Sequence, residues 1–248
     1  MIHGLGLSGR YFTPVARRLA ADGHTVVVPD LPGTVRSRAA VRTTPGTEEL
    51  ASSLGRWYAA AGLGPCLLVG HSVGCQVAAA FAARHPEFIA RVLLTGPALE
   101  PGASAWRQLG RLLADAPREP WSLLFLAVSD YLTTGPVRFL SALRGALRDA
   151  EGAFEARLRV IDVPALVVRG SGDPLAPAAW AERVAALLPK GGAAVVEDAA
   201  HAAHFSAPDR MAALITTFLS DPAPSSSDRS ASARFLGQPA ESRMESRL

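Results

Sequence analysis

Apolar residues along this chain gather in short continuous runs that alternate with stretches of helical spacing. Runs such as "CLLVG" and "VLLTG" are too short for ordinary helices, and they are apolar at nearly every position instead of at every second one. That pattern is typical of strands buried on both faces of a parallel sheet. We predict strands within residues 24–30, 65–70, 90–96, 163–170 and 193–198.

The stretches between these runs carry the start and stop signals of helices. Thr13 and Pro14 suit the first turn of one helix, and Gly23 suits its end. The acids Glu48 and Glu49 open another helix, where its dipole favours them. Strands that alternate with helices predict an α/β fold, in which helices flank a mostly parallel central sheet. The predicted helices cover residues 13–23, 47–62, 73–86, 178–188 and 208–219.

Two segments break this alternation. Residues 98–160 contain helical patterns but no convincing strand, which favours an inserted helical lid. From residue 221 onward the chain is rich in Ser, Pro and Arg and poor in large apolar residues, which predicts a disordered tail over 221–248. The core of the fold is therefore expected to consist of residues 1–97 and 161–220.

Composition narrows the class of protein. The 248 residues are 49% hydrophobic and 19% charged, which suits one globular domain with a lid. The net charge of +3 is small and scattered, so nucleic acid is not expected as a partner. No apolar stretch approaches a membrane span, and no signal peptide pattern is visible, so we expect no membrane partner and a cytoplasmic location. Cys66 and Cys75 are interpreted as buried thiols.

The stretch "GHSVG", residues 70–74, lies between a predicted strand and a predicted helix. A strand-to-helix turn this sharp strains the backbone at Ser72 and pushes its hydroxyl outward. Gly70 and Gly74 are then needed, because side chains at these positions would clash with their neighbours. We interpret Ser72 as a candidate nucleophile.

A serine hydroxyl needs a base, and the base needs an orienting acid. Asp173 follows the predicted strand "ALVVRG", at the edge where parallel sheets collect their sites, and Glu100 is the second candidate for the acid. The loop "AAHAAHF" offers His201 and His204 as bases, and His201 is preferred because it lies nearer the end of the strand. The order of serine, acid and histidine is the one that this architecture uses.

Together, the stretches "HGLG", "DLPG", "GHSVG", "GSGDPLAP" and "AAHAAHF" make the chain resemble serine hydrolases of the α/β-hydrolase fold, of the esterase and cofactor-free haloperoxidase type. The resemblance implies Ser72 as nucleophile, His201 as base and Asp173 as orienting acid. It further implies an oxyanion hole made by the backbone N–H groups of Leu5 and Val73. No cofactor is expected, and no metal either, because His201-x-x-His204 is the only metal-like spacing of histidines and lacks further neighbouring ligands.

The expected activity is hydrolysis of a small, apolar ester or related acyl bond through an acyl-enzyme. Acyl transfer to peroxide or another acceptor on the same triad is an alternative, as is a non-catalytic protein of this fold that binds a ligand or partner. His3 and Gly4 are expected to border the substrate, and Trp106 and Trp121 of the lid to line an apolar pocket.

The resemblance also implies a full strand before His3–Gly4, whereas only Met1 and Ile2 precede this pair. A typical strand runs about 5–6 residues. We therefore expect either that the start of the chain is assigned too late or that this is a truncated relative with impaired stability.

Overall fold

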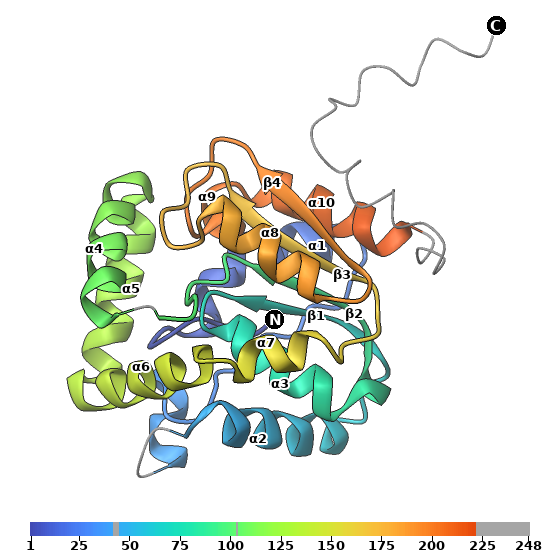
Figure 1. Ribbon diagram of the computed structural model, residues 1–248, viewed down its shortest axis with the longest axis horizontal. Coiled ribbons are helices and arrows are strands. Elements are labelled where there is room, and N and C mark those ends of the chain that lie inside the picture. Colours follow the sequence, from blue (N-terminus) through green and yellow to red (C-terminus); the bar gives the residue numbers. More distant parts are fainter. Residues whose placement is uncertain (42–44, 103, 222–248) are drawn as a thin grey trace, which may run out of the picture.

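The computed structural model describes residues 1–41, 45–102 and 104–221. Four parallel strands form one sheet in the order β1-β2-β3-β4 (Figure 1). The strands are β1 (Cys66–His71), β2 (Ile89–Thr95), β3 (Ala165–Gly170) and β4 (Gly191–Val196). Each lies within two residues of a predicted run, which confirms the parallel α/β architecture.

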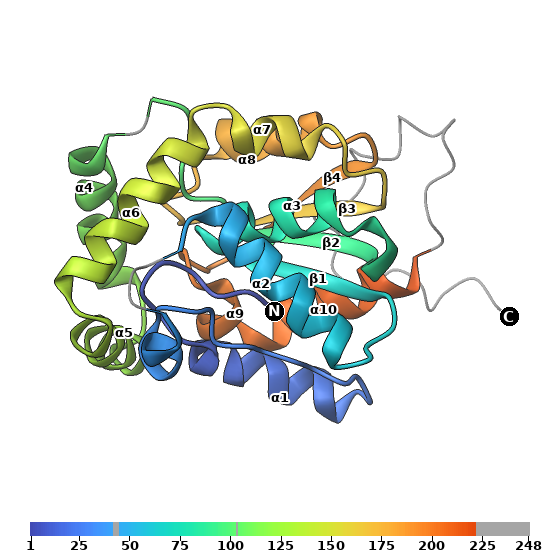
Figure 2. The same ribbon diagram turned by 90° about the horizontal axis from the view of Figure 1, so that it is seen from below.

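Helices cover both faces of this sheet (Figure 2). Along β2, Val92 and Leu94 pack into one apolar cluster and Leu93 into another, because successive side chains of a strand point to opposite faces. The first cluster lies under α2 (Thr47–Ala60), α3 (Gly74–Arg84), α7 (Ala153–Leu158) and α8 (Ala178–Leu187). The second lies under α1 (Thr13–Ala21), α9 (Ala203–Ser206) and α10 (Pro208–Ser220). The sheet is therefore buried on both sides, as continuous apolar runs predict.

The strand predicted over residues 24–30 is wrong. This segment is extended, but it joins no strand ladder. The amino group of Met1 donates to the Val27 carbonyl at 2.7 Å, and Ile2 forms a single parallel bridge to Gly70 of β1. A strand is defined by a row of hydrogen bonds to a neighbour, and here two residues, Met1 and Ile2, connect residues 24–30 to the sheet.

Between β2 and β3 the chain is helical, with α4 (Ala105–Asp115), α5 (Trp121–Thr134) and α6 (Pro136–Ala150) at one end of the molecule (Figure 1, left). We refer to residues 104–150 as the helical segment. Acidic side chains of this segment reach the loop that follows β4, so the segment lies at the carboxyl ends of the strands. Its action as a lid stays a prediction.

Short 3-10 helices complete the fold at η1 (Gly9–Phe12), η2 (Val35–Ala40), η3 (Pro86–Phe88) and η4 (Ala116–Arg118). Among the described residues, no helix combines the length and the apolar character needed to cross a bilayer. The predicted disordered tail lies outside the described residues, apart from Asp221.

Candidate active site

Ser72 lies on a strained turn between β1 and α3. Its φ is 58°, in the left-handed region that residues other than glycine rarely adopt, and its N–H donates to the Thr95 carbonyl at 2.9 Å. A Cβ on Gly70 would lie 2.8 Å from Ala78, and one on Gly74 would lie 2.5 Å from the Ile2 carbonyl oxygen. Both glycines are therefore required by close packing, as the motif predicts.

His201 and Asp173 form a buried hydrogen-bonded pair. The Nδ1 atom of His201 lies 3.0 Å from Asp173 Oδ2, and the two residues are 7% and 3% exposed. The other carboxylate oxygen, Oδ1, accepts the N–H groups of Leu175 and Ala176 at 2.8 and 3.1 Å. Because a carboxylate only accepts, Nδ1 carries the proton and Nε2 of the neutral ring keeps a free electron pair. This is the tautomer that a general base needs.

The two groups shift each other's pKa. Burial acts to lower the pKa of His201, but the adjacent charge and hydrogen bond of Asp173 outweigh it and raise the pKa above its usual value. Burial likewise acts to raise the pKa of Asp173, but the charge of His201 and three hydrogen bonds lower it. The Asp173 carboxylate therefore favours the protonated form of the His201 ring.

Ser72 lies beside this pair. A Cβ on Gly96, the residue after Thr95, would lie 3.0 Å from the His201 ring and 3.2 Å from Asp173 Oδ2, so the chain next to Ser72 runs against both. The rings of His71 and His201 lie 4.6 Å apart between centroids. In the described part of the chain, Ser72 Oγ forms no hydrogen bond to His201. Such bonds are often loose in free enzymes and tighten when substrate binds.

The backbone N–H groups of Leu5 and Val73 donate no hydrogen bond within the described residues. Gly4, which precedes Leu5, packs against the turn: a Cβ on it would lie 3.2 Å from Ser72 Cβ. Unpaired amides are rare in folded proteins unless water or a ligand reaches them. Two such amides flanking Ser72 match the predicted oxyanion hole in position.

His3 holds this loop in place. Its Nε2 accepts the Leu31 N–H at 2.9 Å, so Nδ1 carries the proton and donates to the Gly4 carbonyl at 3.0 Å. The peptide bond between Gly4 and Leu5 is trans, so fixing its carbonyl on one side aims the Leu5 N–H to the other. With 1% of its surface exposed and both ring nitrogens occupied, His3 positions the loop, and together with Gly4 it lines a narrow cavity.

A chain of buried hydrogen bonds connects the same loop to the histidine. The Gly4 N–H donates to the Tyr11 hydroxyl at 2.8 Å, and this hydroxyl lies 2.7 Å from His71 Nδ1. His71 Nε2 donates in turn to the His201 carbonyl at 3.1 Å. Because Nε2 must be the donor to a carbonyl, Nδ1 accepts the Tyr11 proton and the ring is neutral. Burial, with smaller contributions from His204 and His201, lowers the pKa of His71 accordingly.

His204, the alternative base, and Glu100, the alternative acid, have environments that differ from those of His201 and Asp173. His204 is 1% exposed, packs against Tyr11 and Phe12 at 4.5 Å between ring centroids, and has no partner for either ring nitrogen in the described chain. Burial lowers its pKa to about 3, which makes it a neutral core residue. Glu100 accepts from Arg111 at 2.7 Å instead of from a histidine. The geometry therefore favours His201 and Asp173.

Two acidic side chains of the helical segment also reach the loop that carries His201. Asp115 Oδ1 accepts the His201 N–H at 3.2 Å, and Glu119 Oε1 accepts the Ala202 N–H at 2.6 Å. Burial raises the pKa of both carboxyls, in Glu119 to about 7. No sequence signal identified these two residues, or Tyr11 and His71, because isolated polar side chains in helices and turns are normally solvated.

Trp106 and Trp121 do not line a buried pocket. They are 82% and 77% exposed, so the structure gives no support to the predicted substrate contacts. The helical segment instead contributes small residues, Ala142, Gly145 and Ala146, to a narrow cavity of about 50 Å³. This cavity is also lined by Gly4, Leu5 and Val73, and so it opens beside the two unpaired amides.

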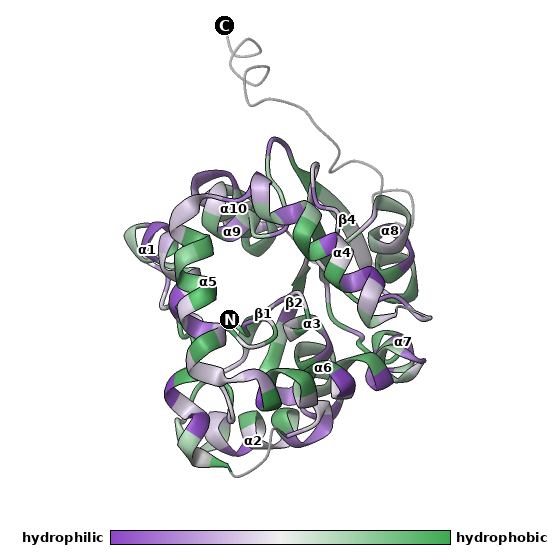
Figure 3. Ribbon diagram, turned by 90° about the vertical axis from the view of Figure 1, so that its left-hand side faces the viewer, coloured by the Kyte–Doolittle hydropathy of each residue, from purple (hydrophilic) through white to green (hydrophobic). Residues whose placement is uncertain are grey.

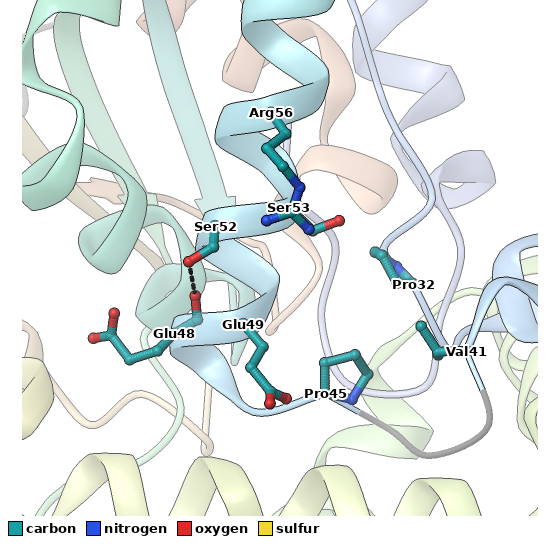
Figure 4. Close-up of a pocket in the computed structure, with 8 residues that line it drawn as sticks. All are labelled: Pro32, Val41, Pro45, Glu48, Glu49, Ser52, Ser53 and Arg56. Atoms are coloured by element: carbon teal, nitrogen blue, oxygen red, sulfur yellow. Dashed lines mark hydrogen bonds between the residues drawn. The ribbon is translucent and has the colours of Figure 1, made fainter.

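A larger cavity of about 460 Å³ lies between α2 and the loop before it (Figure 4). None of the predicted site residues lines it. Its lining residues are Pro32, Val41, Pro45, Glu48, Glu49, Ser52, Ser53 and Arg56. Within the described ranges, no three His, Cys, Asp or Glu side chains gather in a way that would hold a metal ion.

Residues 1–214 match the sequence model of the "Alpha/beta hydrolase family". The chain belongs to the α/β hydrolase family. Among curated proteins it is similar to the magnesium-chelatase 30 kDa subunit of Rhodobacter capsulatus, with 25% identity over 88% of this chain and 85% of that protein.

Solved structures show the same fold. An esterase from Thermogutta terrifontis superimposes with a TM-score of 0.72 and 23% identity, covering 88% of this chain and 87% of its own. A bromoperoxidase from Bacillus anthracis gives 0.69 and 17% identity, covering 89% and 90%. At these identities the likeness establishes the architecture, and the chemistry has to be argued from the site.

Proposed function

We propose that this protein is a serine hydrolase that cleaves a small ester or related acyl bond through an acyl-enzyme. Ser72 is the nucleophile, His201 the general base and Asp173 the acid that orients it. The observation that carries the proposal is the strained Ser72 turn, φ 58°, beside a histidine whose Nδ1 is bound to a buried carboxylate. Family membership and the esterase-like fold support it.

The reaction divides into two acyl transfers. Ser72 Oγ attacks the acyl carbon while its proton moves to His201 Nε2, and the carbonyl oxygen becomes an oxyanion facing the Leu5 and Val73 amides. Each such donor contributes about 2.7–4 kcal/mol to the transition state. Collapse breaks the ester bond, and the leaving alkoxide takes the proton from His201. Water, deprotonated by the same nitrogen, then releases the acid and restores Ser72.

The narrow cavity beside the Leu5 and Val73 amides limits the size of the acyl group that can bind there. About 50 Å³ admits a short chain, and its small lining residues Ala142, Gly145 and Ala146 are apolar. A Cβ on Gly145 would meet no atom within 4 Å, so a larger side chain can occupy this space without strain. We therefore propose short, apolar acyl groups as substrates.

Hydrolysis of p-nitrophenyl esters of increasing acyl length tests this proposal. The expected kcat/KM is highest for short chains and falls for long ones, and Gly145→Leu moves the maximum toward acetate. Gly110→Leu is the matched control, since Gly110 lies in α4, outside the cavity, and gains the same helix propensity. Rates that keep rising with chain length, or equal shifts in both variants, would contradict the proposed acyl pocket.

A further inference from the structure

Large apolar side chains concentrate on the outside of the helical segment. In the described part of the chain, nine of the twelve exposed large apolar residues lie in α4, α5 and α6. Figure 3 faces this side of the molecule, and apolar residues recur along all three helices. The nine are Trp106, Leu109, Leu113, Trp121, Phe125, Val128, Leu132, Val137 and Leu140.

On α5 these side chains form one stripe. Trp121, Phe125, Val128 and Leu132 follow the spacing i, i+4, i+7, i+11, and each is more than half exposed. Helical geometry places Asp130 on the opposite side, where it is fully buried and accepts hydrogen bonds from Ser8. The stripe therefore points away from the contact between α5 and Ser8.

The same inversion occurs on α4. Trp106, Leu109 and Leu113 share the exposed face, whereas Gln108 and Asp115 lie on the buried one. A helix on a soluble protein ordinarily turns its apolar stripe to the core. Because α4 reverses that rule and α5 carries large apolar residues on its exposed side as well as on the side that buries Leu123, the exposed stripes are not explained by packing within the chain.

The exposed charged side chains of the helical segment are positive. All four carboxylates of the helical segment are buried: Asp115, Glu119, Asp130 and Asp149. The arginines Arg118, Arg144 and Arg148 are exposed, and none forms an ion pair in the described chain, although the charge of Arg118 acts on Asp115. The outer surface is therefore both apolar and cationic. We call it the apolar–basic face, formed by the nine apolar residues and these three arginines.

A second copy of the chain is a poor partner for this surface. Two apolar–basic faces would bring exposed arginines together with no exposed carboxylate of the segment to oppose them. Tryptophan and phenylalanine beside arginine instead match the interface of a bilayer with anionic headgroups.

We propose that the apolar–basic face binds the surface of an anionic lipid bilayer, so that α4 and α5 lie in the headgroup layer without crossing it. The expectation of no membrane partner rested on the lack of a spanning segment, and it does not apply to surface binding. Trp121 and Phe125 enter the boundary of the acyl chains, while Arg118, Arg144 and Arg148 pair with phosphate. The proposal does not depend on the proposed hydrolase activity, since binding needs no working triad.

Co-sedimentation with vesicles tests it. The full chain is expected to bind vesicles of phosphatidylcholine with phosphatidylglycerol, to bind pure phosphatidylcholine more weakly, and to be released by salt. The double variant Trp121→Ser/Phe125→Ser is expected to lower the partition coefficient at least about tenfold on anionic vesicles. Arg144→Gln and Arg148→Gln are each expected to lower it roughly fivefold, and only on anionic vesicles.

The controls are Val160→Ser, which removes an exposed apolar residue outside the face, and Arg56→Gln on α2. Both are expected to bind as the unchanged chain does. Ser72→Ala is expected to bind equally well, which separates this proposal from failure of the hydrolase. No binding to anionic vesicles, or binding that survives the Trp121/Phe125 change, would overturn it. So would sedimentation of a dimer that only the Trp121/Phe125 change dissociates, without vesicle binding.

Discussion

The body of the molecule and the helical segment bury opposite kinds of side chain. In the body, strands such as β2 place Val92, Leu93 and Leu94 entirely out of solvent. In the helical segment, Asp115 and Asp130 are buried while large apolar residues face outward. Apolar burial holds the body together, whereas the segment combines a few apolar contacts, such as those of Leu123 and Ala146, with buried carboxylates that accept hydrogen bonds from the body.

The hydrogen bonds that the carboxylates of the helical segment accept lie close to the candidate site. Asp115 and Glu119 accept from the backbone of His201 and Ala202, and Asp130 accepts from Ser8. Each contact falls next to the candidate site or to the loop that carries Leu5. The segment is thus coupled to the geometry of the site, and its attachment depends on charge in a way that the body's core does not.

The largest effect on kcat is expected from a change in Asp173, which lies in the body of the molecule. Asp173→Asn leaves the shape of the site but no longer holds His201 in the tautomer that a base needs, so kcat should fall by about 10⁴. Glu100→Gln, the change at the alternative acid, should leave kcat within about twofold. Steady-state rates on a short p-nitrophenyl ester measure both, and an equal loss in the two variants would reassign the acid.

The next effect concerns the attachment of the segment. Asp130→Ala removes a fully buried carboxylate that binds the Ser8 N–H and hydroxyl and pairs with Arg10. The expected loss in the free energy of unfolding is about 3–5 kcal/mol. Asp162→Ala breaks an exposed pair with Lys190 and should cost less than about 1 kcal/mol. Urea denaturation compares them, and similar losses would mean that the segment is not held through Asp130.

A third test uses pH. Burial raises the pKa of Glu119 from 4.5 to about 7, so between these values the folded protein holds a proton that the unfolded chain has released. Stability from this group is therefore lost as the pH rises through that window. Glu119→Gln removes the effect, and its advantage over the unchanged chain should grow by about 3 kcal/mol from pH 5 to pH 8.

Urea denaturation at several pH values measures this difference. Glu182→Gln, at an exposed position on α8, provides the control and should show no trend. The difference in the free energy of unfolding between Glu119→Gln and the unchanged chain could instead stay constant with pH. That result would show that the burial of Glu119 does not control the pH dependence of stability.

The smallest effect is expected from the hydrogen bonds between Tyr11 and its partners. Tyr11→Phe leaves the Gly4 N–H and His71 Nδ1 unpaired, at a cost of about 1–3 kcal/mol in stability. Because Tyr11 positions the loop of Gly4 and Leu5 as well as the His201 loop, kcat should fall about tenfold with KM little changed. Tyr58→Phe, whose hydroxyl donates to Gly64, serves as control. A change in KM alone would exclude a positioning role.

Much of the fold is predictable from the sequence because its signals are local. The runs that became β1 to β4 are apolar throughout, and helices cover both of their faces. Residues 24–30 carry the same signal, but a strand also needs a neighbour, and the run itself holds no information about that. Ser72, Asp173 and His201 each follow the carboxyl end of a strand in one parallel sheet, which places all three at the same edge of that sheet.

The helical segment was less predictable for a physical reason. Apolar spacing identifies a face of a helix, and the usual inference is that this face is buried. Here polar residues such as Gln108 and Asp130 take buried positions, and the inward placement expected of Trp106 and Trp121 fails. Tyr11 and His71 act through hydrogen bonds between distant parts of the chain, which no spacing pattern encodes.

Labelling with a fluorophosphonate, followed by peptide mass mapping, tests directly whether Ser72 is an activated nucleophile. A probe of this kind reacts with a serine that an adjacent base activates. We predict one adduct, on Ser72, that forms on the unchanged chain and on Ser220→Ala, forms more slowly on Asp173→Asn, and is absent from Ser72→Ala. No adduct on the unchanged chain, or an adduct on a residue other than Ser72, would contradict it.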